Sequence, residues 1–343
     1  MRTDLAIVGG GPAGLAAAIL AARGGMSVTV FEPKSGVIDK ACGEGIQPAG
    51  VAALARLGIR PAGVPFLGIH YADAVDPALF ARGTFPAGHG LGVRRTTLHA
   101  ALLEAAGGLP ITFRDERITE LPDAGWIIGA DGLSSTVAAL INPPIRRSGR
   151  LGLRRHYRVA PWSDRVEVYF ARGGEAYVTP VADDEVGIAL LFSGENQRAH
   201  GVAAFERRLE GFPLLGLRLA GRAHASKTRG AGPFDRRVRR QTKDNVLLIG
   251  DAAGYVDPLT GEGVAVGLQT AEAAVECILC GTPAAYARRY RELTGTYFRL
   301  TRVLRAVAAR RWLHAPLLRG ARFLPSVFDA TLGVLGGPVH NFE

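Results

Sequence analysis

The amino-acid sequence predicts a mixed α/β fold with an inserted antiparallel β-sheet and a helical C-terminal region. Three observations predict it. A glycine-rich turn joins a strand-like run to a helix-like run at the N-terminus, alternating apolar residues fill the middle of the chain, and amphipathic, arginine-rich segments end it. The 343 residues are 48% hydrophobic and 21% charged, which is enough to bury the cores of about two folding units.

The first 32 residues have the pattern of a strand, a tight turn, a helix and a second strand. Residues 4–8 are an apolar run that predicts a buried strand, and an Ala-rich helical run follows and ends at Gly24 and Gly25. Residues 27–31 predict the second strand. The turn holds Gly9, Gly11, Pro12, Ala13 and Gly14, and Glu32 closes the second strand. This is the dinucleotide-binding fingerprint of a Rossmann-like fold in its required structural context.

Each position of the fingerprint has a physical role. Gly9 permits the tight turn, Gly11 lets a pyrophosphate approach the backbone, and Gly14 lets the helix pack closely on the strand. The helix N-terminus offers free N–H groups and a positive dipole end to the phosphates. Glu32 can accept hydrogen bonds from the adenosine ribose hydroxyls. The fingerprint alone does not separate NAD from FAD.

Two later segments identify the cofactor by resemblance. Residues 129–137 read GADGLSSTV, and residues 246–271 read VLLIGDAAGYVDPLTGEGVAVGLQTA. Together with the N-terminal fingerprint they resemble the motif set of the para-hydroxybenzoate hydroxylase and geranylgeranyl reductase superfamily of flavoproteins, over residues 1–60 and 93–285. The resemblance implies an oxidoreductase with non-covalent FAD and with NAD(P)H as a transient reductant, bound without a second glycine-rich fingerprint.

The resemblance also implies the cofactor-contacting residues. Asp251 binds the ribityl chain, and the loop after it leads into a helix whose N-terminus stabilises negative charge on the reduced ring. Asp131 contacts the pyrophosphate region or solvent, or orients local backbone, and Arg95 contacts the cofactor from a helix start, with Arg94 as the alternative. The remaining residues of this set are Gly250, Pro258, Gly261, Glu262, Gly263 and Val264.

Two segments interrupt the FAD-binding part, which is expected to comprise residues 1–60, 93–150 and 243–285. Residues 61–92 and 151–242 are expected to form a substrate-binding β-sheet domain. Its strand-like runs LRRHYRVA, RVEVYFA, EAYVTPV and EVGIALLF predict an antiparallel meander, with a helix in 195–210 packed on it. In the resembled superfamily, such a sheet roofs the flavin and binds the substrate.

The roof strands predict a mostly apolar substrate pocket. Arg154, His156 and Arg158 alternate along one strand and therefore share a face, which we expect to be solvated surface; pointing inward, it would offer an anion site. The resemblance places Tyr177 and Pro180 at the substrate. The apolar side chains expected to line the pocket are Val166, Val168, Phe170, Tyr177, Val178, Ile188, Leu190 and Phe192.

Residues 286–343 mix apolar residues with regularly spaced Arg, an amphipathic helical pattern that we expect to break at Pro316 and Pro325. We expect a helical cap packed on the core. The alternative is a surface that makes peripheral contact with a membrane or lines the access route of an apolar substrate.

Three functions remain open. An NAD(P)H-driven monooxygenase acting on a hydrophobic aromatic or polyketide-like substrate is slightly favoured. The first alternative is a C=C reductase of a polyprenyl or other lipid, because KACGEGIQPAG at 40–50 resembles the geranylgeranyl reductase branch, although its Tyr-x-Trp-x-Phe-Pro motif is replaced by Tyr177-Val-Thr-Pro180. The second is a non-catalytic flavin-binding sensor. The resemblance places Cys42 near the flavin as a candidate catalytic residue, and His70, His89 and His156 are candidate proton shuttles.

Charge and cysteine content bear on whether the protein binds nucleic acid or a metal, and on its compartment. The net charge of +10 is expected to be solvated surface, and its arginine runs lack the interleaved aromatic residues of a nucleic-acid platform. The three cysteines indicate a reducing compartment, and Cys277 and Cys280 are expected to lie on one helix face without a metal. Gly9 to Pro12 interrupt the uncharged run 5–22, so we expect no targeting segment and a cytoplasmic protein.

Overall fold

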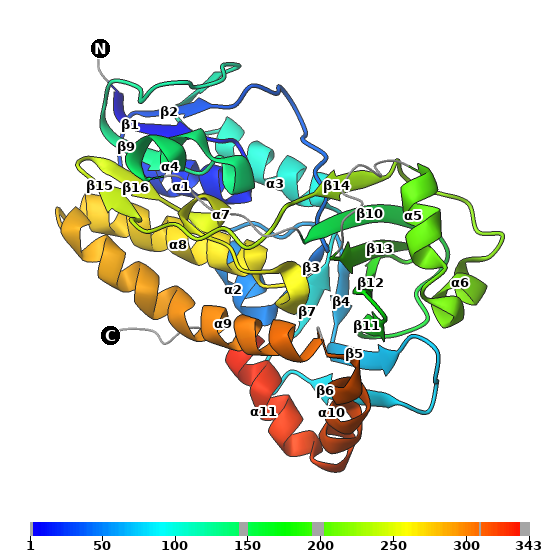
Figure 1. Cartoon of the computed structure of the whole chain (residues 1–343). Helices are drawn as coiled ribbons and strands as arrows, with labels where there is room; N and C mark the ends of the chain where they lie inside the picture. The colour runs from blue at the N-terminus through cyan, green and yellow to red at the C-terminus, as the bar shows by residue number, and fades with distance from the viewer. Residues whose placement is uncertain (1–2, 144–149, 194–201, 309, 337–343) are drawn as a thin grey trace.

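The computed structural model describes residues 3–143, 150–193, 202–308 and 310–336. Its strands form a six-stranded, a seven-stranded and a three-stranded sheet (Figure 1). The strands are β1 Thr3–Val8, β2 Val28–Phe31, β3 Gly45–Ile46, β4 Val64–Phe66, β5 Gly68–Asp73, β6 Phe80–Thr84, β7 Gly90–Gly92, β8 Ile111–Arg114, β9 Ala124–Gly129, β10 Leu151–Arg158, β11 Val166–Ala171, β12 Gly174–Ala182, β13 Glu185–Phe192, β14 Arg229–Ala231, β15 Thr242–Lys243 and β16 Val246–Leu248.

The helices lie around these sheets and, toward the C-terminus, follow one another along one side of the molecule (Figure 1). They are α1 Pro12–Arg23, α2 Pro48–Arg56, α3 Arg95–Gly107, α4 Thr136–Ile141, α5 Val202–Leu209, α6 Pro213–Leu219, α7 Gly250–Ala253, α8 Gly263–Leu279, α9 Tyr286–Ala308, α10 Arg311–Phe323 and α11 Pro325–Gly336, with the 3-10 turns η1 Gly132–Ser134, η2 Pro258–Thr260 and η3 Pro283–Ala285.

The six-stranded sheet is the Rossmann-like part that the fingerprint predicted. Its order is β15-β16-β9-β1-β2-β8, and all neighbours are parallel except β15 and β16. The strands β1, β9 and β16 are buried on both faces, as apolar runs in a helix-covered parallel sheet should be. Pro12 begins α1 at a position where its missing N–H costs nothing. The three elements α1, α8 and β1 share one continuous core.

The seven-stranded sheet has the order β14-β10-β13-β12-β11-β5-β6, so the expectation of a simple meander was partly wrong. The strands β11, β12 and β13 do form a meander. The strand β10 does not pair with β11; it crosses to the far side and pairs with β13 over its whole length. The strand β5 joins β11 in parallel. A pattern of alternating residues predicts strands but not their partners, which explains the error.

The two faces of the seven-stranded sheet bury different cores. Val166, Val168, Phe170 and Tyr177 share one core with Leu259 of the third motif and with residues of the C-terminal helices. The other side chains expected in the substrate pocket, Val178, Ile188, Leu190 and Phe192, lie on the opposite face and pack with residues of α5 and α6. Because neighbouring residues of a strand point to opposite faces, only half of the predicted apolar lining faces the third motif.

The C-terminal helices form a cap on that same face. Phe170 of β11 stacks on Tyr71 at 5.8 Å between ring centroids and lies 5.0 Å from the ring of His314 in α10. Phe328 of α11 meets Tyr71 edge-on. Pro325 begins α11, as expected, but Pro316 lies inside α10 and does not end it. Among the described helices, none combines the length and the apolar character needed to cross a bilayer.

Candidate functional site

Four adjacent parallel strands bring the predicted cofactor residues to one edge of the six-stranded sheet. In spatial order, Asp251 follows β16, Asp131 follows β9, the glycine turn follows β1, and Glu32 follows β2. The carboxyl ends of parallel strands meet at one edge, which is where open α/β sheets bind their ligands. Residues separated by more than 200 positions in the sequence are therefore neighbours in the structure.

The three fingerprint glycines lie in different surroundings. A Cβ on Gly14 would come within 1.9 Å of the Gly9 carbonyl oxygen, and a Cβ on Gly9, which has φ +109°, would meet Ala130 at 2.5 Å. A Cβ on Gly11 would meet only a terminal nitrogen of Arg95, at 3.9 Å. Gly9 and Gly14 are thus required by the fold, whereas the space in front of Gly11 is left for a ligand.

Arg95 lies beside that open space and supports the fit of a dinucleotide. Arg95 is the first residue of α3 and is 6% exposed. Its Nη1 has no hydrogen-bond partner among the described residues. A buried guanidinium nitrogen without a partner is costly unless a ligand satisfies it. The N-terminus of α1 has no side-chain cap at Gly11. These groups suit the FAD pyrophosphate, so the residues present fit the cofactor that the resemblance implies.

Arg94, the alternative to Arg95, points elsewhere. It forms an ion pair of 3.1 Å with Glu185 of β13 and approaches His156 Nδ1 at 3.3 Å. The structure therefore places Arg95, not Arg94, at the fingerprint.

Glu32 and His99 hold the glycine turn from two sides. Glu32 Oε2 accepts a hydrogen bond of 3.0 Å from the Gly10 amide. The Ile38 amide donates to His99 Nδ1, so the other ring nitrogen carries the proton and donates to the Gly10 carbonyl at 2.7 Å. Burial lowers the pKa of His99, although its bond to Gly10 opposes this effect. No sequence motif includes His99, so its contact with the glycine turn could not be predicted.

Asp131 orients local backbone, one of the roles expected for it. Its Oδ2 accepts hydrogen bonds of 2.6 Å from the Thr136 amide and 3.3 Å from the Val137 amide, at the N-terminus of α4. Its other oxygen, Oδ1, is buried without a partner among the described residues. Asp131 therefore has one oxygen left for a ligand at the sheet edge.

Asp251 lies in the first turn of α7, directly after β16. Burial raises the pKa of its carboxyl, while Lys40, Arg236 and Arg95 act in the opposite direction. Gly250 has a φ of +52°, and a Cβ on it would lie 3.3 Å from Ala13 Cβ. The turn after β16 therefore packs against α1 at Gly250 and Ala13. Asp251 thus lies between the fingerprint helix α1 and the three cations named above.

The loop 258–263 lies against the segment 43–47. Gln47 donates from Nε2 to the Thr260 carbonyl at 2.9 Å, and Gly261 adopts a left-handed φ of +71°. Pro258 begins the 3-10 turn, and Gly263 and Val264 begin α8. Glu262, at the N-cap of α8, is 5% exposed with an unpartnered Oε1 among the described residues, and burial raises its pKa well above the usual value.

Cys42 lies at the start of that segment, beside a strained residue. Glu44 has a left-handed φ of +62°, and its amide donates to Cys42 Sγ at 3.4 Å. Burial, followed by the charge of Glu44, raises the pKa of the Cys42 thiol. Cys42 is therefore a neutral thiol and not an activated nucleophile. Strain in a non-glycine residue is typical of functional segments.

Arg154 and His156 point inward, so the expectation of a solvated face was wrong for both. They are 2% and 0% exposed, whereas Arg158 at the end of the strand is exposed. Arg154 pairs with Asp39, and His156 Nε2 pairs with Glu44 Oε2. The protein's own carboxylates, not a ligand, occupy the anion site that an inward face would offer.

The hydrogen bonds around His156 define its tautomer. Guanidinium nitrogens of Arg94 and Arg154 each lie 3.3 Å from Nδ1, and an arginine can only donate. Nδ1 is therefore the acceptor, and the proton lies on Nε2, toward Glu44. The Ser226 hydroxyl lies 2.7 Å from Nδ1. The result is a buried, hydrogen-bonded pair next to Cys42 that the sequence could not reveal, because its members are 112 residues apart.

Tyr177 joins the roof to the third-motif loop, whereas Pro180 lies against β7. The Tyr177 hydroxyl donates to the Leu259 carbonyl at 3.2 Å, and a Cβ on Gly92 would lie 1.8 Å from the Pro180 carbonyl oxygen. Burial raises the pKa of Tyr177 well above its usual value. Tyr177 thus positions the third-motif loop against the sheet.

The remaining histidine and cysteine candidates lie apart. His70 accepts a hydrogen bond of 3.3 Å from Arg82 near the sheet edge, and His89 is exposed. Cys277 is buried in α8, and Cys280, at the C-cap of the same helix, is exposed. Within the described residues, no group of three His, Cys, Asp or Glu side chains could hold a metal ion.

Comparisons with known proteins agree with the site. The FAD binding domain family matches residues 87–280, and the NAD(P)-binding Rossmann-like domain family matches residues 7–37. Menaquinone reductase of Mycolicibacterium smegmatis is 27% identical, over 87% of this chain and 81% of the relative. Digeranylgeranylglycerophospholipid reductase 1 of Methanopyrus kandleri is 29% identical, over 88% of each chain. The 6-methylpretetramide 4-monooxygenase of Streptomyces rimosus is 28% identical, over 90% of this chain and 80% of the relative.

Solved structures share the fold. The flavin-dependent brominase Bmp2 superposes with a TM-score of 0.82 over 99% of this chain and 95% of the brominase, at 15% sequence identity. That likeness extends through the roof sheet and the C-terminal helices, so the whole architecture is one that flavoproteins use.

Proposed function

Since this chain belongs to the FAD binding domain family and is an FAD-dependent oxidoreductase, we propose that it reduces a C=C bond in a polyprenylated or similar lipid-like substrate. One observation carries the choice of reaction: the buried pair of His156 and Glu44 beside the neutral thiol of Cys42. Reduction of a C=C bond adds a hydride to one carbon and a proton to the other, so the site must hold a proton in a dry environment.

FAD, when bound, supplies the hydride that it has accepted from NAD(P)H. The chain's residues supply the rest. Gly11, the α1 N-terminus and Arg95 would bind the phosphates, Asp251 would bind the ribityl chain, and the α8 N-terminus would lie toward the ring. Cys42 keeps its proton at neutral pH because its pKa is raised, and we assign it as the proton donor. Water restores the proton after the product leaves, and Glu44, held by His156, positions the thiol through its amide.

The apolar face of the roof supports a hydrophobic substrate. Val166, Val168, Phe170 and Tyr177 point toward the third-motif loop, and the helices α10 and α11 cover the same face. We therefore assign substrate binding to residues 61–92 and 151–242 and FAD binding to residues 1–60, 93–150 and 243–285. Backbone groups of the loop 258–263 orient the substrate, because its residues are mostly small.

Product mass tests the reaction. Full-length protein with FAD, NADPH and an isoprenylated quinone or polyprenyl lipid should give a product two mass units heavier, equally well with and without oxygen. Cys42→Ala should leave flavin reduction by NADPH unchanged and lower product formation about 100-fold. A product sixteen mass units heavier that forms only in air would overturn the proposal.

A hydroxylase is the second candidate, and one observation favours it: the 28% identity to a monooxygenase of Streptomyces rimosus is similar to the identity to the reductases. In that case the same apolar face would bind an aromatic or polyketide-like substrate. The product-mass experiment, repeated with alkylated phenols, separates the two reactions.

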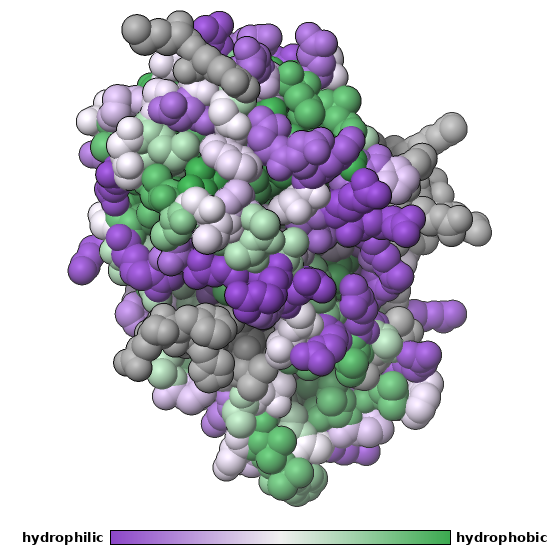
Figure 2. Space-filling model, turned by 90° about the vertical axis from the view of Figure 1, so that its left-hand side faces the viewer, coloured by the Kyte–Doolittle hydropathy of each residue, from purple (hydrophilic) through white to green (hydrophobic). Residues whose placement is uncertain are grey.

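We further propose that the C-terminal helices contact a membrane surface when the substrate is a lipid. Trp312, Phe323, Leu324 and Val327 of α10 and α11 are more than half exposed, and Arg319 and Arg322 lie among them. Figure 2 shows hydrophobic side chains gathered at the lower end, where these helices lie in Figure 1. Co-sedimentation with anionic vesicles, and its loss in Trp312→Ser/Phe323→Ser, tests this contact.

A further inference from the structure

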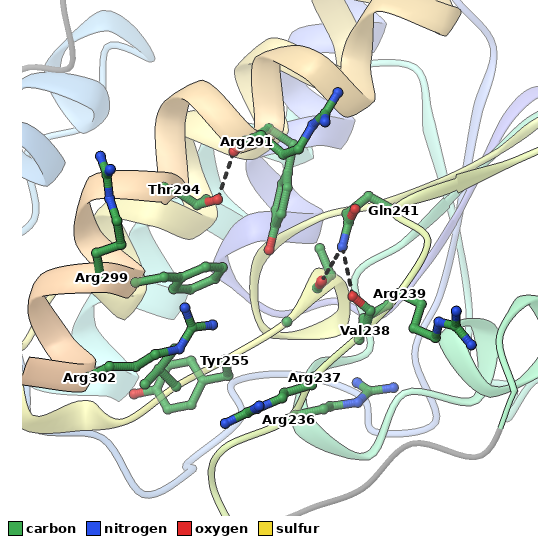
Figure 3. A pocket seen from close by; sticks show the side chains of 16 residues that line it. Arg236, Arg237, Val238, Arg239, Gln241, Tyr255, Arg291, Thr294, Arg299 and Arg302 are labelled. Atoms are coloured by element: carbon green, nitrogen blue, oxygen red, sulfur yellow. Dashed lines mark hydrogen bonds between the residues drawn. The ribbon is translucent and has the colours of Figure 1, made fainter. Parts of the chain in front are cut away.

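Six arginine residues line a pocket behind the third motif, next to the sheet edge that holds Asp251. The pocket has a volume of about 500 Å³ and lies between the segment 236–241, the end of α7 and the middle of α9 (Figure 3). The lining contains no Asp or Glu. Figure 2 shows hydrophilic side chains in a band across the middle of this face of the molecule. The lining arginines are Arg236, Arg237 and Arg239 before β15 and Arg291, Arg299 and Arg302 on α9.

The helix α9 presents its arginines at spacings of eight and three residues, which places them on one face. Gly295 lies between them, and a Cβ there would meet nothing within 4 Å. Figure 3 shows Arg299 and Arg302 on α9 and Arg237 and Arg239 on the facing segment. Like charges gathered around one pocket repel one another unless an anion binds between them.

Most of these charges lack an acidic partner. Arg237 lies 3.6 Å from Asp235, which also pairs with Arg305 at 2.7 Å. In the described part of the chain, no carboxylate lies within ion-pair distance of Arg239, Arg291, Arg299 or Arg302. The excess positive charge is therefore concentrated at the pocket.

A buried hydroxyl is the second, independent sign of a ligand. Tyr290 lines the pocket and is 3% exposed, yet its hydroxyl has no hydrogen-bond partner among the described residues. Gly254, with φ +144°, keeps the backbone clear of this hydroxyl, since a Cβ would lie 3.3 Å from it. An unsatisfied buried hydroxyl costs about 1–3 kcal/mol unless a ligand or a water bonds to it.

The pocket also offers aromatic walls. Phe298 and Tyr255 line it, and the far side of the Tyr255 ring lies 3.4 Å from the Cβ position of Gly263, where α8 begins. A ligand in the pocket would thus be separated by one ring from the loop that faces the flavin.

We propose that this pocket binds an organic phosphate that carries at least two negative charges. Guanidinium groups bind phosphate through paired N–H donors, and the Tyr290 hydroxyl adds a neutral donor. The phosphate can belong to a soluble nucleotide, such as the NADPH that serves as reductant, or to a lipid headgroup. The inference does not rest on the redox reaction, because binding can be measured without turnover.

Calorimetric titration of the full-length, FAD-loaded protein tests the proposal, with pyrophosphate, NADPH, NADH and short-chain phosphatidic acid as probes. Pyrophosphate should bind, and Arg239→Gln/Arg299→Gln/Arg302→Gln should weaken it at least about 30-fold. Tyr290→Phe should weaken it about 5-fold without lowering the melting temperature. Preference for NADPH over NADH identifies a nucleotide ligand, and preference for phosphatidic acid identifies a lipid headgroup; either supports the proposal.

A charge-matched control separates a built site from diffuse attraction. Arg60→Gln/Arg172→Gln/Arg207→Gln removes three exposed positive charges outside the pocket and should change pyrophosphate affinity less than about 2-fold. Equal losses in the two triple variants, or no binding of any phosphate probe at millimolar concentration, would overturn the proposal.

Discussion

Gly11 and Gly14 are three residues apart in the fingerprint, but the structure separates their roles. Gly14 is needed for packing, since a Cβ there would clash with the Gly9 carbonyl oxygen at 1.9 Å, whereas Gly11 faces open space beside Arg95. We expect Gly11→Val to abolish FAD binding and to leave the stability of the apo-protein unchanged. Flavin content and thermal unfolding measure both; equal flavin content in variant and parent would show that the phosphate site lies elsewhere.

Asp251 is the residue whose loss should weaken FAD without removing it. Its carboxylate is expected to accept charge-assisted hydrogen bonds, worth ~1.5–3 kcal/mol each. Asp251→Ala should therefore weaken the binding free energy of FAD by a few kcal/mol at most. Titration of the apo-protein with FAD measures the dissociation constant from which this change is calculated. An unchanged dissociation constant would remove Asp251 from the cofactor site.

His99 links the glycine turn to pH. Burial lowers its pKa below the ordinary 6.5, and the proton on Nε2 already serves the Gly10 carbonyl. A group with a lowered folded pKa contributes stability that is present above pH 6.5 and lost as pH falls below it. FAD retention should decrease between pH 6.5 and 5, followed by flavin fluorescence. This decrease should be smaller in His99→Gln, which cannot titrate; an identical pH profile would exclude His99 as its origin.

At the residue scale, sequence motifs indicated the fingerprint, Glu32, Arg95 and Asp251 as candidates because motifs act through local chain geometry, and their contacts with FAD stay a prediction. It did not predict His99, Glu44 or the inward direction of Arg154. These side chains acquire their roles from partners far away in the sequence, and an alternating strand pattern does not say which face is buried.

The strand β10 carries a charged connection between the roof and the FAD-binding part. Arg154 pairs with Asp39, and its Nε lies 3.9 Å from Glu44 Oε1. Burial opposes ionisation of Asp39, but hydrogen bonds from Arg154 and Arg229 outweigh it and lower the pKa of Asp39. The connection therefore depends on the buried guanidinium of Arg154, and its removal should lower the stability of the fold.

Arg154→Met should destabilise the protein by at most about 3–5 kcal/mol, because it removes the buried cation beside Glu44 and leaves Asp39 with Arg229 alone. Arg158→Met, on the same strand but exposed, should change stability by less than about 0.5 kcal/mol. Urea unfolding compares them. Adding Asp39→Asn to Arg154→Met should recover part of the loss, and equal stabilities of the two single variants would contradict the account.

At the element scale, the strands of the roof were predictable and their order was not. The segments around β10 to β13 have clear period-two patterns, yet β10 pairs with β13 and not with β11. Strand pairing depends on contacts between residues far apart in the sequence, which a local pattern does not contain; Arg155 of β10, for example, lies over Phe205 of α5 at 4.3 Å. Pro316 shows the reverse: a local helix-breaking signal is overridden by the packing of α10 on β6.

Across the whole molecule, three distant segments meet at one site. The sheet edge holds the residues proposed to bind the phosphates and the ribityl chain, the loop 258–263 leads into the α8 N-terminus, and the segment 42–47 joins both to the roof through Glu44 and His156. The proposed reduction of a C=C bond depends on the Cys42 thiol that lies in this segment.

The absorbance spectrum of the full-length protein under nitrogen tests the central claim most directly. The account predicts about one FAD per chain, bleaching of its colour by NAD(P)H, and return of the colour when an unsaturated polyprenyl substrate is added before any air. A colourless protein that cannot be reconstituted with FAD, or a reduced flavin whose colour returns only in air, would contradict it.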